Sequence, residues 1–295
     1  MLTSLIVNPF ASRVSRRAVE TVVRVLERVG SVEVRQTERA GHAVELAREA
    51  RGDAIVVFSG DGGFNEVLNG LERDVPVGFV PGGGTSVLPR ALGLAREPAA
   101  AARRVAVALE TGRTRRISLG RVNGRRFAFS AGVGLDAEFI RRVDARGRTS
   151  SGRRPGDAYF LWTIARVLWQ HRGGLEPVLE VEGLGKAPFV LVANGDPYSY
   201  VGARPVRLAP LARFELGLDL VAPFSVSRGK LPRYARYALR GHGQEAAADV
   251  IYAHDGDRFA VHCDRPMPLQ ADGEDLGDVE DVVFEAERDA VSVLW

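Results

Sequence analysis

Residues 53–70 have the sequence DAIVVFSGDGGFNEVLNG, in which a run of apolar residues leads into three closely spaced glycines. The stretch Asp53–Ser59 predicts a buried strand, and the residues from Asn65 to Leu71 predict a helix. Glycine lets a backbone approach a phosphate closely, and a helix N-terminus offers unpaired N–H groups. Asp61, which lies between the first two glycines of the stretch, can bind a metal ion through water or accept a proton. The stretch therefore predicts a phosphate site, with a plain strand-to-helix turn as the alternative.

Two other predicted strand ends carry similar residues. The cluster Pro81–Ser86 (PGGGTS) lies between a strand and a helix, and the first strand, Leu2–Val7, leads into Asn8–Ser12 (NPFAS). An Asx-type turn explains Asn8 equally well when it is taken alone. Ligands bind at the carboxyl ends of strands in an open parallel sheet, so three such ends together favour a nucleotide crevice. The missing G-x-G-x-x-G and Gly-Lys-Ser/Thr patterns count against a nicotinamide-dependent oxidoreductase and against a P-loop.

The wider pattern predicts two domains. Strand and helix signals alternate over residues 1–118, which indicates an α/β domain with a parallel sheet and helices on both faces. Residues 119–288 carry the short strands of a C-terminal β-sandwich domain, interrupted by one helix at Asp157–His171. The strand candidates of this part are Arg115–Leu119, Phe127–Ser130, Val178–Val181, Phe189–Asn194, Arg213–Val221, Arg258–Cys263, Met267–Ala271 and Val282–Ala286.

Composition excludes several classes of protein. The 295 residues are 45% hydrophobic, which suffices for two packed cores, and the single cysteine, Cys263, rules out a disulfide framework. We expect no signal peptide, and the apolar run at Ala158–Trp169 is too short to span a bilayer. The formal charge is +3, and most basic residues are arginine. A genome that favours arginine codons explains this composition, and attraction to anionic lipid is the alternative. We therefore expect a cytoplasmic protein with peripheral membrane contact and no nucleic-acid partner.

At this point the sequence resembles a known family. The motifs Asn8-Pro9, Gly41-His42-Ala43 after Thr37, and Gly60-Asp61-Gly62 followed by Asn65-Glu66-Val67 and Asn69-Gly70 are similar to the diacylglycerol kinase catalytic domain. The resemblance continues through Ala131–Glu138, Val192–Gly195, Leu208–Pro210 and Gln270–Glu274. That family includes bacterial lipid kinases and sphingosine kinases, and it is distantly related to NAD kinases and phosphofructokinases.

The resemblance implies a kinase with ATP and Mg²⁺ in the cleft between two domains. Residues from about Asp289 to Trp295 would return to the first domain. The resemblance further implies ATP-dependent transfer of the γ-phosphate to a lipid hydroxyl. The expected acceptor is diacylglycerol or a related lipid alcohol, as in phospholipid biosynthesis. The nucleotide contacts would be Asn8, Pro9, Phe10, Ala11, Ser12, Thr37, Gly60, Asp61, Gly62, Gly63, Phe64, Asn65, Glu66, Gly83, Gly84 and Thr85.

Three acidic residues are the catalytic candidates. We expect Glu274 to act as the base that takes the proton of the lipid hydroxyl, with Asp272 and Asp61 organising Mg²⁺ and the phosphates. The alternatives are Asp61 as the base, and an ordinary acidic β-turn at Asp272-Gly273-Glu274.

Several positions depart from the family pattern. Ser59 and Gly63 replace the glycine and threonine of G-G-D-G-T, and Ser86 stands where asparagine is usual. The stretch Glu215-Leu216-Gly217 stands where many bacterial members have D-D-G, so we expect a structural Mg²⁺ site to be absent, because leucine offers no oxygen ligand.

Two alternatives stay open, namely an enzyme of the NAD kinase type and a non-catalytic lipid-binding protein with the same fold. A membrane surface is the expected partner, and the sequence leaves a homodimer open. The aromatic residues of Asp157–His171 are either core residues or, with the preceding arginines, a lip that faces lipid. Those arginines are Arg141, Arg142, Arg146, Arg148, Arg153 and Arg154.

Overall fold

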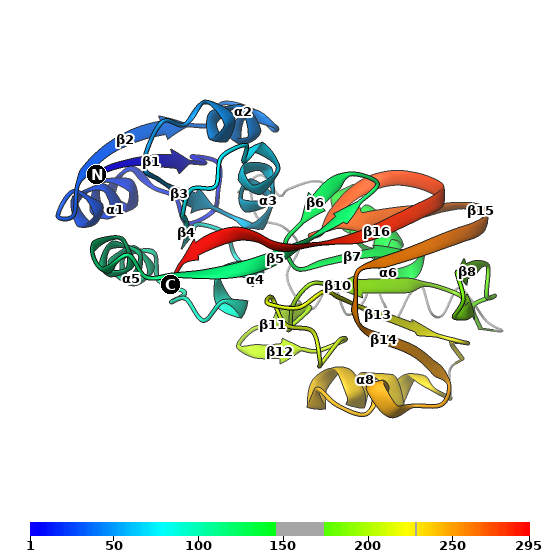
Figure 1. The fold of residues 1–295 in the computed structure, drawn as a ribbon. Helices are drawn as coiled ribbons and strands as arrows, with labels where there is room; N and C mark the ends of the chain where they lie inside the picture. Colours follow the sequence, from blue (N-terminus) through cyan, green and yellow to red (C-terminus); the bar gives the residue numbers. More distant parts are fainter. Residues whose placement is uncertain (146–173, 228) are drawn as a thin grey trace. The chain divides into compact units, whose positions relative to one another are not determined.

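The structure is a computed structural model that describes residues 1–145, 174–227 and 229–295. The helix expected at 157–171 lies outside these residues. The chain divides into two compact units, the first formed by residues 1–118 and 288–295 and the second by residues 119–287 (Figure 1). The first unit has a parallel sheet with helices and the second is rich in strands, so the predicted fold class is confirmed.

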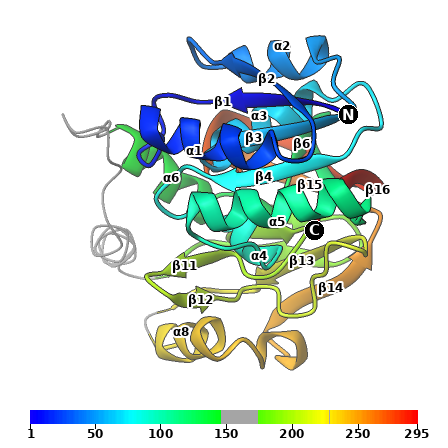
Figure 2. The ribbon, with the colours of Figure 1, turned by 90° about the vertical axis from the view of Figure 1, so that its left-hand side faces the viewer.

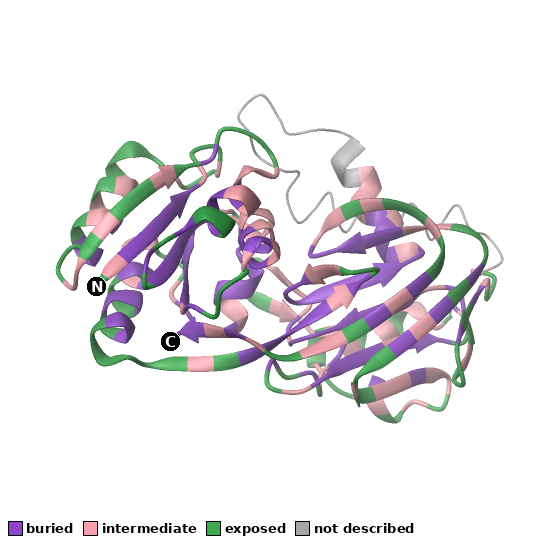
Figure 3. Cartoon of the chain, turned by 45° about the horizontal axis from the view of Figure 1, so that its top comes forward, coloured by how far each residue is buried: buried purple, intermediate pink, exposed green. Residues whose placement is uncertain are grey.

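The sheet of the first unit has the order β16-β4-β3-β1-β2, and each of these pairs is parallel. Its three inner strands are buried almost throughout (Figure 3), whereas β2 has the mixed exposure of an edge strand. This explains why the inner strands are mainly apolar along their whole length, with no alternation of polar and apolar residues. The strands are β1 (Leu2–Val7), β2 (Ser31–Gln36), β3 (Ala54–Ser59), β4 (Val77–Pro81) and the end of β16 (Glu274–Leu294).

Helices cover both faces of this sheet. Helices α1 (Arg16–Leu26) and α5 (Pro98–Thr111) pack on each other and on one face (Figure 2). Helices α2 (His42–Glu49) and α3 (Asp61–Gly70) pack on each other and against the other face, and the short α4 (Val87–Ala91) follows β4. Successive side chains of a strand point to opposite faces, so each inner strand supplies both layers of core.

The second unit is built on an antiparallel sheet of order β14-β13-β10-β7-β15-β16. Its core gathers apolar residues from all of these strands. The strands are β6 (Arg125–Phe127), β7 (Ser130–Val133), β8 (Leu179–Val181), β9 (Gly185–Ala187), β10 (Val190–Ala193), β11 (Ser199–Val201), β12 (Arg204–Val206), β13 (Leu218–Pro223), β14 (Val250–Gly256) and β15 (Arg258–Ala271).

The second unit also holds helices α6 (Leu135–Ala145) and α8 (Leu231–Arg240) and the 3-10 turn Gln244–Ala246. Strand β5 (Thr114–Val122) carries the chain from the first unit into the second, and β16 carries it back. Among the described residues, no helix combines the length and the apolar character needed to cross a membrane.

Candidate functional site

Helix α3 begins at Asp61, four residues earlier than the sequence predicts. The glycines suggest a loop, but the Phe64 amide donates to the Gly60 carbonyl over 3.1 Å, which closes the first helical turn. Phe64 is fully buried and packs edge-on against Phe79, with ring centroids 5.2 Å apart, so core packing outweighs the low helix propensity of glycine. The first-turn N–H groups, which lack intrahelical acceptors, therefore start directly at the end of β3.

Three strand ends meet at this helix terminus. The Asn8 amide donates to the Phe58 carbonyl over 3.0 Å, and the Gly82 amide donates to the Ser59 carbonyl over 2.6 Å. The two glycine clusters touch, because a Cβ atom added to Gly83 would lie 2.9 Å from the Cα atom of Gly60. Any larger residue at position 83 would push the clusters apart.

Asp61 links the two glycine clusters. Its carboxylate accepts hydrogen bonds from the amides of Val87 (3.0 Å) and Leu88 (3.2 Å), the first two residues of α4. Ser86, just before α4, has a left-handed backbone with φ of 49°, and its hydroxyl donates to the Gly83 carbonyl. Asp61 thus fixes the loop after β4 against the start of α3, a structural role that sequence reasoning missed.

The other predicted nucleotide contacts lie around this point with different exposures. Phe64 and Asn65 are buried, so they can reach a nucleotide only through the backbone, and Thr37 is buried at the end of β2. The Glu66 carboxylate accepts from the Ala43 amide at 3.1 Å, which caps α2. The half-buried residues are Asn8, Ala11, Gly60, Asp61, Gly62, Gly63 and Gly83, and the exposed ones are Pro9, Phe10, Ser12, Gly84 and Thr85.

These residues fit a nucleotide phosphate. Small residues and backbone amides gather at a helix N-terminus, and a Cβ atom on Gly84 would meet nothing within 4 Å. No group of three or more His, Cys, Asp or Glu side chains in the described ranges is arranged to hold a metal ion. A Mg²⁺ ion that arrives with a nucleotide takes most of its ligands from phosphate and water, so one nearby carboxylate such as Asp61 suffices.

In the second unit, Asp272 is a buried anchor. It occupies the turn between β15 and β16 with φ of 48°, and it is only 4% exposed. Its carboxylate accepts from the amides of Ala128 (2.6 Å), Phe129 (2.9 Å) and Ser130 (3.2 Å). The backbone between β6 and β7 is therefore held by both oxygen atoms of the Asp272 carboxylate.

Glu274 lies two residues further along the same hairpin. Its carboxylate pairs with the Arg125 guanidinium at 2.5 Å, and 31% of its side chain is exposed. It can therefore be reached from outside the unit, unlike Asp272.

A buried carboxyl that sequence reasoning did not single out lies beside this turn. Asp136, near the start of α6, accepts hydrogen bonds from the Tyr198 hydroxyl and the Gln270 amide, and Gln270 in turn accepts from the Gly273 amide at 3.0 Å. Burial raises the pKa of Asp136 above its ordinary value, and these two hydrogen bonds offset part of the shift. The signal that could have found it is its place in the motif Ala131–Glu138.

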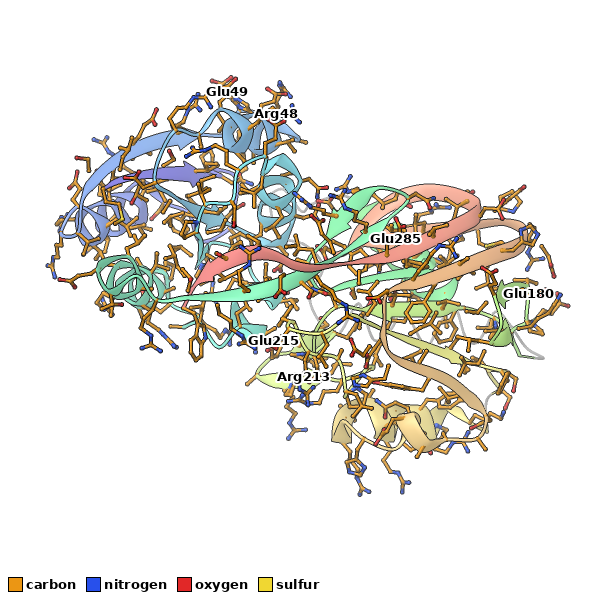
Figure 4. The ribbon with its side chains drawn as sticks, viewed as in Figure 1. Arg48, Glu49, Glu180, Arg213, Glu215 and Glu285 are labelled. Carbon is orange, nitrogen blue, oxygen red and sulfur yellow. The ribbon has the colours of Figure 1, made fainter. Side chains whose placement is uncertain are left out.

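The loop Glu215-Leu216-Gly217 precedes β13, and Figure 4 labels Glu215 on it and Arg213 just before it. The Leu216 amide donates to the Arg213 carbonyl (3.0 Å), and the Gly217 amide donates to the Asp255 carboxylate (2.6 Å). The expected absence of a structural Mg²⁺ site here stays a prediction.

Comparisons with known proteins show which family this chain belongs to. Residues 3–122 match the model of the diacylglycerol kinase catalytic domain. Diacylglycerol kinase of Bacillus subtilis is 30% identical over 285 residues, which cover 92% of this chain and 88% of that protein. The chain belongs to the diacylglycerol kinase catalytic-domain family. The resemblance inferred from the sequence is thereby confirmed.

Further similar proteins and solved structures support this family and fold. A probable lipid kinase, YegS-like, of Chromohalobacter salexigens is 32% identical over 207 residues, covering 68% of this chain and 63% of that protein. A crystal structure described as a putative diacylglycerol kinase from Bacillus anthracis aligns with a TM-score of 0.78 at 22% identity, over 99% and 94% of the two chains. An NAD kinase from Archaeoglobus fulgidus in complex with ATP aligns with a TM-score of 0.54 at 14% identity, over 99% and 93% of the two chains, which shows a shared fold only.

Proposed function

We propose that this protein is a lipid kinase that transfers the γ-phosphate of ATP to the hydroxyl of a membrane lipid, diacylglycerol or a related lipid alcohol. The observation that carries the proposal is the meeting of three strand ends at the N-terminus of α3, where the two glycine clusters touch. Such a terminus favours phosphate, because its amides point outward and its dipole is positive. Kinship with proteins named diacylglycerol kinase and lipid kinase supports a lipid acceptor.

In this proposal the first unit binds ATP. The amides at the start of α3 and in the loop after β4 hold the phosphates, and Asn8 to Ser12 form one wall. Mg²⁺ bound with the nucleotide would neutralise phosphate charge, and Asp61 is the carboxylate best placed to meet it. Phosphoryl transfer depends mainly on positioning and charge, so a rigid backbone cradle is the main contribution of this chain.

We assign the role of general base to Glu274. The carboxylates of Asp61 and of Asp272 each hold backbone amides through both oxygen atoms, so taking up a proton would weaken contacts that fix the backbone. Glu274 is partly exposed, and the Arg125 guanidinium orients its carboxylate. Removal of the hydroxyl proton by a positioned carboxylate contributes roughly 10²- to 10⁴-fold to such a rate.

The test is phosphorylation of lipid vesicles by purified protein with labelled ATP and Mg²⁺. NAD replaces the lipid in one arm, and a diacylglycerol and another lipid alcohol are compared. Transfer to NAD alone would indicate the NAD kinase alternative, and lipid binding without transfer would indicate a non-catalytic member.

Glu274→Gln should lower kcat by about two orders of magnitude or more while leaving the Kd for ATP nearly unchanged. Asp61→Asn should weaken nucleotide binding as well. If Glu274→Gln turns over at the normal rate while Asp61→Asn binds ATP and is inactive, Asp61 is the base.

A further inference from the structure

Ser59, the last residue of β3, has a buried hydroxyl whose position explains a neighbouring glycine. A Cβ atom added to Gly63 would lie 2.0 Å from the Ser59 Oγ atom and 2.7 Å from its Cβ atom. Two such atoms cannot coexist, since real Cβ contacts essentially never fall below 3.0 Å. The side chain of Ser59 therefore occupies the place of a side chain at position 63. The two departures from the family pattern, serine at position 59 and glycine at position 63, therefore compensate each other: one side chain fills the space that the other leaves.

The hydroxyl also lacks a partner. Ser59 is 1% exposed, and its Oγ atom has no hydrogen-bond partner among the described residues. A buried hydroxyl without a partner destabilises a fold, so each case calls for an explanation such as a ligand or a bound ion. The Ser59 hydroxyl lies against the first turn of α3, at the candidate phosphate site, and the amide Nδ2 atom of Asn8 lies 3.9 Å from the same Cβ position on Gly63.

We propose that the Ser59 hydroxyl is a nucleotide-binding group of this protein, which donates a hydrogen bond to a phosphate oxygen and takes over the task of a side chain at position 63. The inference rests on the proposed use of ATP. It predicts that the hydroxyl stabilises the complex and does not stabilise the free protein.

The decisive variant is Ser59→Ala, which removes the hydroxyl and keeps the β carbon. A lost hydrogen bond to a charged group should raise the Kd for ADP and for a non-hydrolysable ATP analogue by roughly tenfold or more. The midpoint of urea unfolding without nucleotide should stay the same or rise. Titration calorimetry and urea denaturation measure the two effects separately.

Ser4→Ala is the matched control. Ser4 is equally buried in β1, but its hydroxyl accepts a hydrogen bond from the Gly52 amide at 3.2 Å. That variant should lower stability and leave the Kd unchanged, the opposite result. Equal nucleotide affinity of Ser59→Ala and the unchanged protein would overturn the inference. If the unchanged protein binds no nucleotide, the proposed function fails, and the proposed contact of Ser59 with phosphate fails with it.

The spatial exchange has its own test, whose stability part needs no nucleotide. Gly63→Thr alone should lower the unfolding midpoint, because its side chain collides with Ser59. Combined with Ser59→Gly, the same substitution should recover most of the loss and restore nucleotide affinity through the threonine hydroxyl. If the two substitutions act additively on stability, the two side chains do not share one space and the inference fails.

Helix α8 supports a second, independent inference. No residue of this helix is fully buried, and its segment from Lys230 to Arg240 (KLPRYARYALR) has four basic residues and no acidic one. Lys230 and Arg233 pair with Asp249, whereas Arg236 and Arg240 are exposed and have no ionic partner among the described residues.

An apolar side chain lies between these two arginines. Leu239 is 62% exposed, the highest value among the exposed large apolar residues. Exposed arginines around an exposed leucine, without acids, match the charge of an anionic bilayer surface and offer an apolar group to its interface. We infer that α8 docks this protein on anionic membranes, where its proposed lipid substrate resides.

Flotation with vesicles tests this without nucleotide, so the outcome is independent of kinase activity. Partition onto vesicles of phosphatidylglycerol and phosphatidylcholine should exceed partition onto pure phosphatidylcholine. Arg236→Ala with Arg240→Ala should reduce it roughly 30-fold, at about fivefold for each arginine.

Arg24→Ala with Arg28→Ala removes the same charge, with the same spacing, from an exposed part of the first unit, and should have little effect. Equal losses in both double variants would show attraction by net charge alone. Unchanged partition of the α8 variant would likewise overturn the docking surface.

Discussion

Replacing Asp272 by alanine should loosen the second unit before any ligand is involved. The carboxylate is 4% exposed and accepts hydrogen bonds from three consecutive amides, those of residues 128–130. Each buried N–H group left without an acceptor costs about 1–3 kcal/mol, and water entering the site recovers part of that. We expect Asp272→Ala to lower the free energy of unfolding by about 3–5 kcal/mol, a large share of the roughly 5–15 kcal/mol typical of a domain.

Asp272→Asn should cost less, about 1–3 kcal/mol, because it keeps one carbonyl oxygen and tolerates the left-handed backbone of the turn. Urea denaturation without nucleotide or Mg²⁺ gives the overall loss, and hydrogen exchange of the amides of residues 128–130 reports the local one. Asp278→Ala is the control, since Asp278 lies on the same hairpin in a half-exposed pair with Arg141, worth about 0–1 kcal/mol. If both Asp272 variants are as stable as the unchanged protein and lose only Mg²⁺-dependent activity, Asp272 is a metal ligand, as the sequence suggested, and not an anchor.

Three titrating groups give further predictions. Burial raises the pKa of Asp136 in the folded state, so its contribution to stability is present at low pH and is lost as pH rises through that pKa. Asp136→Asn should remove this fall in stability, which urea denaturation measures from the ordinary carboxyl pKa upward. The Arg126 guanidinium lowers the pKa of Glu287, so that pair stabilises the fold above the ordinary carboxyl pKa and is lost as the pH falls through the lowered pKa. Glu287→Gln should cost about 1 kcal/mol at pH 7 and progressively less on acidification. Burial raises the pKa of the Cys263 thiol to about 11, so iodoacetamide should modify it at pH 8 much more slowly in the native than in the urea-unfolded protein.

The first unit could be predicted from sequence because its strands lie between two layers of helices. Continuous apolar runs such as Ala54–Ser59 then mark strands with nearly correct ends. The start of α3 was missed because local propensity at Gly62 and Gly63 favours a loop, and only the tertiary burial of Phe64 closes the turn.

The elements of the second unit are harder to predict from the sequence. The stretch Arg213–Val221 was expected to be a strand, but it begins with tight turns and pairs only from Leu218. Two strands were expected within Arg258–Ala271, which is one strand with a register shift where Pro266 and Pro268 interrupt the ladder. Helix α6 and strand β14 carry no strong local pattern and were not expected.

For the candidate site, glycine-rich strand ends identified the phosphate loop. Hydrogen bonds between distant segments could not be predicted in the same way. The contact of Asp61 with α4 joins residues 26 positions apart, and the contact of Asp272 with Ala128 joins residues 144 positions apart. No local periodicity reports such pairs, so their roles emerge only from coordinates.

The return of the chain to its first unit has a consequence for biosynthesis. Val291, Val293 and Leu294 are buried in that unit, and Val293 pairs with Val77 of β4. The ribosome adds these residues after the whole second unit, residues 119–287, has been made. The nascent first unit therefore has an open side of β4 until residues 288–295 are made, and a chain that stops before them offers that side to other unfinished chains.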